Sequence, residues 1–257
     1  MSQKRSDSRF RDAGAFVILG AAGGIGSAVA RRLAFHGAPL VLGGRTVGPL
    51  EEIAAELDAK AVVMDATSFS EVNNTLEAGL QLNGGHIAGF VNCVGSILVK
   101  PAHLTTEEEW ADTVAQNLTS AFATVQACAR FMKNGGSVVL LGSCAGEIGL
   151  PSHEAIAAAK AGVSGLVRSA AASYARRNLR VNAVAPGLVD TPLAKSITKN
   201  ERALETSRAM HPLGRIGDPE DIASAILWLL DPANDWITGQ TIGVDGGLAR
   251  LTGRSAG

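Results

Sequence analysis

The alternation of short apolar runs with segments of helical length constrains the fold of this chain more than any other feature. The pattern continues from residue 15 to residue 244. It is typical of right-handed β-α-β units, which build a parallel sheet covered by helices on both faces. The strand candidates are residues 15–19, 39–44, 61–64, 86–92, 137–143, 180–185 and 241–244.

We therefore predict one α/β domain, a doubly wound parallel sheet of about seven strands (a Rossmann fold) over residues 15–250. A chain of 257 residues with 46% hydrophobic and 18% charged residues can bury a large core, and no Pro/Gly/Ser-rich linker divides it. We expect flexible tails at residues 1–14 and 251–257. Residues 188–215 are the least periodic and predict a substrate loop. The helix candidates are residues 27–37, 51–57, 69–82, 107–132, 152–176 and 219–230.

Composition argues against several functional classes. The formal net charge of −1 gives no basic field for nucleic acid or for an anionic membrane. No apolar run approaches the ~18 residues of a membrane span, and the polar N-terminus lacks the core of a secretory signal. The three cysteines form no CxxC pair, so we expect reduced thiols, no bound metal and a cytoplasmic protein.

A glycine-rich turn, LGAAGGIGSAVA, lies between the first strand candidate and the helix that follows it. Gly20, Gly24 and Gly26 have a G-x-x-x-G-x-G spacing. Glycines at such positions let backbone N–H groups approach a phosphate, which the positive end of the helix also attracts. Glycines serve plain turns as well. The position between a strand and a helix, in the first β-α-β unit, favours nucleotide binding.

The end of the second strand candidate indicates which nucleotide is bound. Dinucleotide-binding folds place an acidic residue on the ribose hydroxyls about 20 residues after the glycines. This chain has Gly44 there, followed by Arg45. A guanidinium can pair with a 2′-phosphate, which a carboxylate would repel. Unless Arg45 is only a solvated loop charge, the sequence favours NADP(H) over NAD(H).

These motifs, in this order, resemble the short-chain dehydrogenase/reductase family over nearly the whole chain, and most closely its 3-oxoacyl-carrier-protein-reductase-like branch. The matching segments are MDAT, VNCVG (Cys-Val in place of the family's middle pair), QNLTSAF, LLGSCAG, VNAVAPGLVDTPL, HPLGRIGDPEDIASAILWLL and ITGQTIGVDGG. The resemblance implies a catalytic Ser143, a ribose-binding Lys160 and a water-holding Asn117. It implies cofactor contacts from Gly20, Ala22, Gly24, Ile25, Gly26, Arg45, Asp65, Ala66, Asn92, Gly95, Lys160, Pro186, Gly187, Val189 and Thr191.

One catalytic residue of the family is missing. The family has a tyrosine thirteen residues after the serine and four before the lysine. Counting from Ser143 and from Lys160 leads to the same position, which holds Ile156. The single tyrosine, Tyr174, lies fourteen residues beyond Lys160, more than about 20 Å along a helix. Isoleucine cannot transfer a proton, so the ordinary ketone–alcohol reaction should be slowed.

A histidine near the start of the same helix is the candidate replacement. His153 lies seven residues before Lys160, where the enoyl-reductase relatives in this superfamily carry their tyrosine. Positions three and seven residues apart share one helix face. The alternative is that Ser152 caps the helix and His153 and Glu154 only occupy its first turn. Cys144 has no evident activating partner and is assigned to packing.

Two functions remain open from the sequence. The first is an NADP(H)-dependent oxidoreductase that transfers hydride between nicotinamide and a carbonyl/alcohol substrate or a conjugated C=C bond, with the proton from His153 or from water. The second is a catalytically silent NADP(H)-binding homologue that acts as a sensor or partner subunit. The resemblance also implies a homotetramer or homodimer that packs through helices 107–132 and 152–176. The only other partner expected is a small-molecule substrate.

Overall fold

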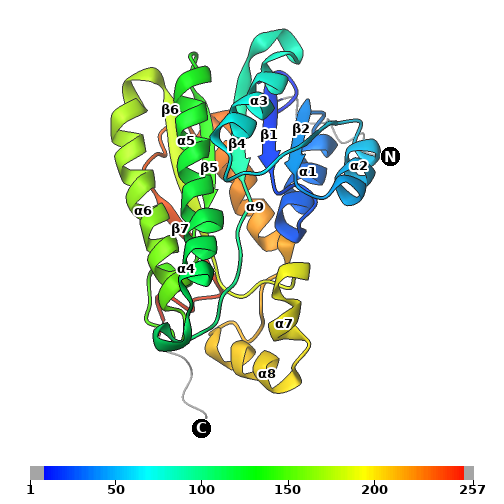
Figure 1. Cartoon of the computed structure of the whole chain (residues 1–257). Helices are drawn as coiled ribbons and strands as arrows, with labels where there is room; N and C mark the ends of the chain where they lie inside the picture. The colour runs from blue at the N-terminus through cyan, green and yellow to red at the C-terminus, as the bar shows by residue number, and fades with distance from the viewer. Residues whose placement is uncertain (1–8, 252–257) are drawn as a thin grey trace.

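Seven parallel strands form one sheet in the computed structural model, which describes residues 9–251 (Figure 1). The strand order is β3-β2-β1-β4-β5-β6-β7, and all neighbouring pairs are parallel. The predicted doubly wound sheet is confirmed. The strands are β1 (Ala15–Leu19), β2 (Leu40–Gly44), β3 (Lys60–Val63), β4 (Ile87–Asn92), β5 (Gly136–Leu141), β6 (Leu179–Pro186) and β7 (Thr241–Val244).

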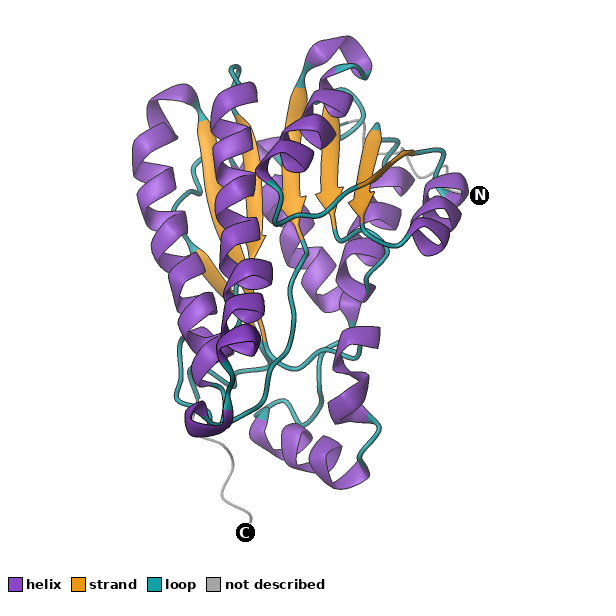
Figure 2. Cartoon of the chain, viewed as in Figure 1, coloured by secondary structure: helices purple, strands orange, loops and turns teal. Residues whose placement is uncertain are grey.

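Helices cover both faces of the sheet and bury two apolar cores (Figure 2). All five residues of β1 are buried because alternate side chains enter opposite cores. Val17 and Leu19 pack towards one layer of helices, and Phe16 and Ile18 pack towards the other. The first layer is α3 (Phe69–Leu80), α5 (Ser120–Phe131) and α6 (Glu154–Tyr174); the second is α1 (Gly24–Phe35), α2 (Val47–Glu56) and α9 (Pro219–Leu230).

The carboxyl ends of the strands share one edge of the sheet, at the bottom of Figures 1 and 2. The strand order reverses between β1 and β4, so the loops after these strands lead to opposite faces. Ligands of such folds bind in the crevice at this edge. Two short helices, α7 (Lys195–Thr198) and α8 (Glu201–Met210), lie beyond it. They belong to the segment 188–215, so that segment is largely helical, whereas the sequence showed little periodicity there.

The helix expected over residues 107–132 is interrupted. It consists of α4 (Glu107–Val114), a π-helical turn (Ala115–Thr119) and α5. Thr106 begins α4 with a capping box, in which its side chain accepts the N–H of Glu109 and Glu109 accepts the N–H of Thr106. The π-helical turn contains the buried Asn117. Such turns are rare and are frequent at functional sites.

The prediction of a flexible N-terminal tail is wrong for residues 9–14. Phe10 is buried, and its ring lies 5.8 Å from that of Phe16 and 5.4 Å from that of His36. Arg9 also donates a hydrogen bond to Asp231 at 2.7 Å. Phe10 adds apolar surface to the core beside α1. The prediction missed this burial because it considered only the polar character of the segment. Residues 1–8 and 252–257 lie outside the described part of the chain.

No helix within residues 9–251 is both long enough and apolar enough to cross a membrane.

Candidate active site

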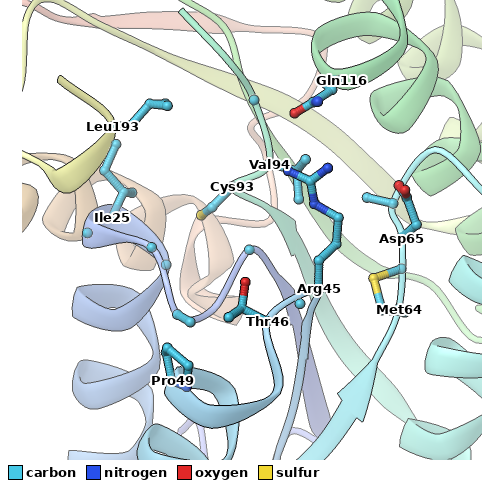
Figure 3. A pocket seen from close by; sticks show the side chains of 18 of the residues that line it. Ile25, Arg45, Thr46, Pro49, Met64, Asp65, Cys93, Val94, Gln116 and Leu193 are labelled. Carbon is cyan, nitrogen blue, oxygen red and sulfur yellow. The ribbon is translucent and has the colours of Figure 1, made fainter. Parts of the chain in front are cut away.

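A groove of about 350 Å³ lies along the carboxyl ends of β1, β2, β3 and β4 (Figure 3). It contains most of the residues predicted to bind a cofactor. From the predicted set, Gly20, Ala22, Gly24, Ile25, Gly26, Arg45, Asp65, Ala66, Gly95 and Thr191 line it. Sequence reasoning missed Cys93 and Val94 as lining residues, and also Gln116, although it is adjacent to the predicted Asn117.

The turn after β1 has the backbone geometry of a phosphate cradle. A Cβ atom on Gly26 would overlap the carbonyl oxygen of Gly20, so the first turn of α1 can approach β1 only with glycine there. Gly20 itself has φ +72°, a left-handed conformation that glycine adopts without strain. The first turn of α1 contains no acidic residue, and its N-cap residue, Gly23, offers no side chain to the free N–H groups. Those groups and the helix dipole favour an anionic phosphate.

The far end of the groove carries one exposed cation beside one carboxylate. Figure 3 shows Arg45 reaching from the end of β2 into the groove, with Asp65 to one side and Ile25 and Leu193 to the other. Within the described residues the Arg45 guanidinium makes no hydrogen bond. Asp65 accepts the backbone N–H and the hydroxyl of Thr67, both at 2.8 Å. These bonds, and to a smaller extent the charge of Arg45, lower the pKa of Asp65.

A smaller cavity of about 140 Å³ continues from the groove. The two spaces share the lining residues Ile25, Cys93, Val94, Gly95, Thr191 and Leu193. The smaller cavity brings together the predicted Ser143, Lys160 and Asn117, which come from the turn after β5, from α6 and from the π-helical turn. Ile156 lines the same cavity one helical turn before Lys160. The site therefore has a long groove that ends in a small pocket with an ammonium and a hydroxyl.

Lys160 is buried in this pocket without an acidic partner. Its Nζ donates a hydrogen bond to the carbonyl oxygen of Leu141 at 2.8 Å, and no carboxylate of the described residues forms an ion pair with it. Burial disfavours the charged form and lowers the pKa of Lys160 to about 8. Cys93 faces it, and burial raises the pKa of that thiol to about 12.

Ser143 lies two residues after the end of β5 and carries a hydroxyl that lines the pocket. Its Oγ accepts the backbone N–H of Ala145 at 3.2 Å, which orients the hydroxyl at the start of a short 3-10 turn. The hydroxyl can still donate its hydrogen to an oxygen in the pocket. Cys144 is buried, and burial raises the pKa of its thiol to about 11, in agreement with a packing role.

Asn117 lines the pocket, but its amide is engaged by the loop after β4. Its Oδ1 accepts the N–H of Ser96 at 3.2 Å, and its Nδ2 donates to Ser96 Oγ and to Thr113 O, each at 2.9 Å. The amide thus fixes the loop that forms the boundary between groove and pocket. Nothing in the sequence indicated Ser96, because this contact joins elements 21 residues apart.

His153 does not join the other predicted catalytic residues. It is the N-cap residue of α6 and is not among the residues that line either space. Its Nδ1 is paired with the carbonyl oxygen of Pro151 at 2.7 Å. His153 itself has a non-helical backbone, with φ −112° and ψ 15°, so it lies outside the regular helix face that its spacing suggested. Ser152 makes no side-chain cap either.

Asn92 is the other predicted residue that lines neither space. It is buried; its Oδ1 accepts the N–H of Val94 at 2.9 Å, and its Nδ2 donates to Thr124 at 3.0 Å. Both polar groups are used to hold the turn after β4 against α5. Asn92 therefore positions the turn after β4 without lining the groove or the pocket.

The loop after β6 closes the pocket on the remaining side. The predicted residues Pro186, Gly187, Val189 and Thr191 all line the pocket. Thr191 also packs against the glycine-rich turn, because a Cβ on Gly24 would lie 2.7 Å from its Cγ2. Within residues 9–251, no group of three His, Cys, Asp or Glu side chains is placed to hold a metal ion.

Comparisons with known proteins agree with this architecture. Residues 20–249 match the family model described as Enoyl-(Acyl carrier protein) reductase. The chain is 35% identical over 241 residues to a 3-oxoacyl-(acyl-carrier-protein) reductase of Thermotoga maritima, with 90% of this chain and 96% of the relative covered. It is also 35% identical over 241 residues to the cis-4-hydroxycyclohexanecarboxylate dehydrogenase of Sinomonas cyclohexanicum, with coverages of 91% and 96%.

A solved structure gives the same result for the fold. A short-chain type dehydrogenase/reductase from Mycobacterium ulcerans superposes with a TM-score of 0.88 at 30% identity, over 93% of this chain and 91% of the other. The sheet order, the glycine-rich turn and these matches together identify the family. The chain belongs to the short-chain dehydrogenase/reductase family of oxidoreductases, in the part that resembles the 3-oxoacyl-(acyl-carrier-protein) reductases.

Proposed function

We propose that the protein is an NADP(H)-dependent oxidoreductase that interconverts a small or medium carbonyl compound and its alcohol, or reduces a conjugated C=C bond. The observation that carries this proposal is the continuity of the two spaces. A groove with a phosphate cradle leads into a pocket lined by Ser143 and Lys160. A reduced nicotinamide bound there would supply the hydride, and the pocket would hold the substrate oxygen.

The preference for NADP(H) rests on charge at the end of β2. Arg45 lines the groove where a carboxylate for the ribose hydroxyls of NAD(H) would be expected. Arg45 has no hydrogen bond to described residues, so its five N–H donors are available to a phosphate. The N-terminus of α2 follows directly, and its N-cap residue, Thr46, makes no side-chain cap. Both features favour an anionic 2′-phosphate.

In the pocket, each polar residue has a separate task. The Ser143 hydroxyl, oriented by Ala145, donates to the substrate oxygen and polarises the carbonyl. Lys160 places a positive charge near the developing alkoxide and is within the part of the site where a ribose would lie. Asn117 holds the loop at Gly95 and Ser96, so the boundary between the groove and the pocket keeps one position. These roles require no group at position 156.

The apolar Ile156 supports one competing function. A pocket without a phenol suits a catalytically silent NADP(H)-binding protein that acts as a sensor or as the partner of an active homologue. Such a protein would bind the cofactor without turnover. Turnover of a substrate distinguishes the two functions, because both proteins would bind the cofactor.

The test combines binding and turnover. NADPH and NADH affinities are measured by quenching of protein fluorescence, and turnover is followed by NADPH oxidation with acetoacetyl-N-acetylcysteamine and crotonyl-N-acetylcysteamine. We expect tighter binding of NADPH and turnover that Ser143→Ala reduces by at least tenfold. The control is Ser169→Ala, an exposed position on α6. Tight NADPH binding with wild-type turnover no faster than that of Ser143→Ala would favour the silent protein.

Assembly and location are further parts of the proposal. Trp110 on α4 and Phe122 on α5 are large apolar side chains that are about half exposed. They support a homodimer or homotetramer that buries this surface. Light scattering should give a mass above that of one chain, and Phe122→Glu should lower it.

The three described cysteines are free thiols, which supports a cytoplasmic location.

A further inference from the structure

We propose that Lys160 itself delivers the proton that reduction of a carbonyl requires, and that it does so from its buried position beside Ser143. The inference rests on the proposed oxidoreductase function. It gives Lys160 a direct chemical role in addition to any contact with a ribose. It also names a proton donor for a pocket in which Ile156, which cannot transfer a proton, takes the place of the family's tyrosine.

The position of Lys160 leaves donors free for this task. An ammonium group has three N–H bonds. Leu141 O accepts one of them at 2.8 Å, and no other hydrogen bond or ion pair within residues 9–251 engages Nζ. The residue is only 7% exposed and lines the pocket, so the remaining N–H groups are available to a substrate oxygen there. A buried ammonium without a carboxylate is costly, and such groups concentrate at functional sites.

No other residue around the pocket can take over the role. Of the residues that line it, only Cys93 and Lys160 carry groups that titrate. Burial raises the pKa of Cys93 to about 12, so this thiol neither donates readily nor carries a charge near neutral pH. Asn117 and Ser96 are hydrogen-bonded to each other, and neither carries a group that titrates. His153, the candidate from the sequence, is paired with Pro151 and lies outside the lining.

Burial also brings the acidity of Lys160 into a useful range. An exposed lysine is a poor acid at neutral pH because its pKa is near 10.4. The desolvation at this site lowers the pKa of Lys160 to about 8. A general acid works best when its pKa lies close to the operating pH. Ile156, which is 5% exposed, contributes to this desolvation by covering the same pocket with apolar atoms.

Reduction of the carbonyl requires one hydride and one proton. The carbonyl carbon receives a hydride, with its electron pair, from a reduced nicotinamide cofactor. The π electrons of the C=O bond move to oxygen while the Ser143 hydroxyl holds that oxygen. An N–H bond of Lys160 breaks, its electron pair stays on Nζ, and the proton forms the O–H bond of the alcohol. Solvent then protonates the neutral amine, and the cofactor leaves oxidised.

The first test needs neither cofactor nor substrate. Protein labelled with 13C at lysine Cε is titrated from pH 6 to pH 11 by NMR, and the Lys160 signal is identified by its loss in Lys160→Arg. We expect this signal to titrate near pH 8, well below the ordinary lysine pKa of about 10.4. A Lys160 signal that titrates above pH 10 would overturn the inference.

The second test is kinetic and separates the inference from the proposed function. With NADPH and acetoacetyl-N-acetylcysteamine, wild-type kcat should fall as the pH rises through the pKa of Lys160. Lys160→Arg keeps a cation but is a far weaker acid. It should retain NADPH affinity within about fivefold, lose at least 100-fold in kcat, and lack the alkaline decline near pH 8. Lys160→Gln serves as the second variant, and exposed Lys133→Arg as the matched control.

The outcomes are distinct. If wild-type turnover occurs and Lys160→Arg keeps kcat within tenfold, or keeps the decline near pH 8, the proton comes from elsewhere and only the inference fails. If the wild type binds NADPH but turns over no substrate, the proposed function fails and the inference fails with it.

Discussion

A Cβ atom built on Gly95 would lie 2.8 Å from the Oδ1 of Asn117, so backbone and amide are in direct contact where the groove meets the pocket. The same hypothetical atom would lie 3.5 Å from the Nζ of Lys160. Asn117 is held by the π-helical turn, and it fixes Ser96 in the loop after β4. Gly95 is therefore the point at which three separate elements of the site approach one another.

Gly95→Ala should lower the affinity for NADPH more than it lowers the stability of the fold. The added methyl group must displace the Asn117 amide, which would release the N–H of Ser96 and widen the loop. We expect NADPH affinity to fall at least tenfold, equivalent to about 1.4 kcal/mol, in fluorescence titrations. Gly165→Ala on α6 is the control, because nothing lies within 4 Å of its added Cβ, and alanine should stabilise that helix slightly. Unchanged affinity in Gly95→Ala would show that the loop adapts at no cost.

Arg45→Asp should reverse the preference between the two cofactors. The carboxylate would repel a 2′-phosphate and could accept hydrogen bonds from ribose hydroxyls. We expect NADPH affinity to fall by roughly 10- to 100-fold, the range of a charge-assisted phosphate contact, while NADH affinity stays equal or improves. The measurement is the ratio of the two dissociation constants at fixed ionic strength. Arg168→Asp, an exposed charge on α6, should leave the ratio unchanged; an equal loss for both cofactors in Arg45→Asp would contradict 2′-phosphate recognition.

The fold could be predicted from the sequence to a large extent because the strands between the two edge strands, β3 and β7, are largely buried on both faces. Such strands appear as continuous apolar runs, and each predicted run overlaps a strand of the sheet. The break between α4 and α5 could not be predicted, because Ala115–Thr119 has no proline or glycine to mark it. The burial of Phe10 was equally hidden, since it depends on Phe16 and His36, which the chain brings near only after folding.

The site was predictable where function depends on local geometry. The glycine-rich turn, Arg45 and the spacing of Ser143 and Lys160 each lie on one β-α unit, so their neighbours in sequence define their surroundings. His153 was misplaced because the helical periodicity was extended back to residue 153, which is the N-cap residue of α6, with φ −112° and ψ 15°, and not part of the regular helix. The hydrogen bonds of Asn92 and Asn117 reach residues 32 and 21 positions away, and no local pattern indicates them.

Ile156→Tyr should increase carbonyl reduction. The phenol would enter the pocket one helical turn before Lys160, and the nearby ammonium would favour its ionised form. We expect kcat for acetoacetyl-N-acetylcysteamine to rise by at least 100-fold, the usual scale of a positioned acid. Ile156→Phe is the matched control, because it adds the ring without the hydroxyl. Equal rates for Tyr and Phe would mean that added bulk, and not the proton, accounts for the change.

His211→Ala should loosen the loop that closes the pocket. His211 is buried beyond α8; its Nδ1 donates to Ser207 O at 2.6 Å, and its Nε2 accepts the N–H of Leu188 at 3.2 Å. It thereby joins α8 to the loop after β6. Removing it leaves two partly buried backbone groups without partners and a cavity at a buried side chain, which should lower the free energy of unfolding by about 2–4 kcal/mol in urea titrations. His103→Ala, at an exposed position, should have almost no effect, and a similarly small effect at His211 would show that the two elements hold together without it.

Lys160→Met should stabilise the protein at neutral pH, and the gain should shrink as the pH rises. Burial lowers the pKa of Lys160 from its ordinary value of 10.5 to about 8. The unfolded chain therefore binds a proton more strongly than the folded chain between these values, so wild-type stability rises with pH there and is lowest below pH 8. Below pH 8 the buried ammonium costs the wild type roughly 3 kcal/mol of stability. The gain in the variant is smaller by about 1 kcal/mol, because the Leu141 carbonyl loses its hydrogen-bond donor. Urea unfolding of Lys160→Met and of wild type at pH 7 and pH 10 measures the difference, with exposed Lys133→Met as the control. A difference that is equal at both pH values would mean that Lys160 keeps an ordinary pKa in the folded protein.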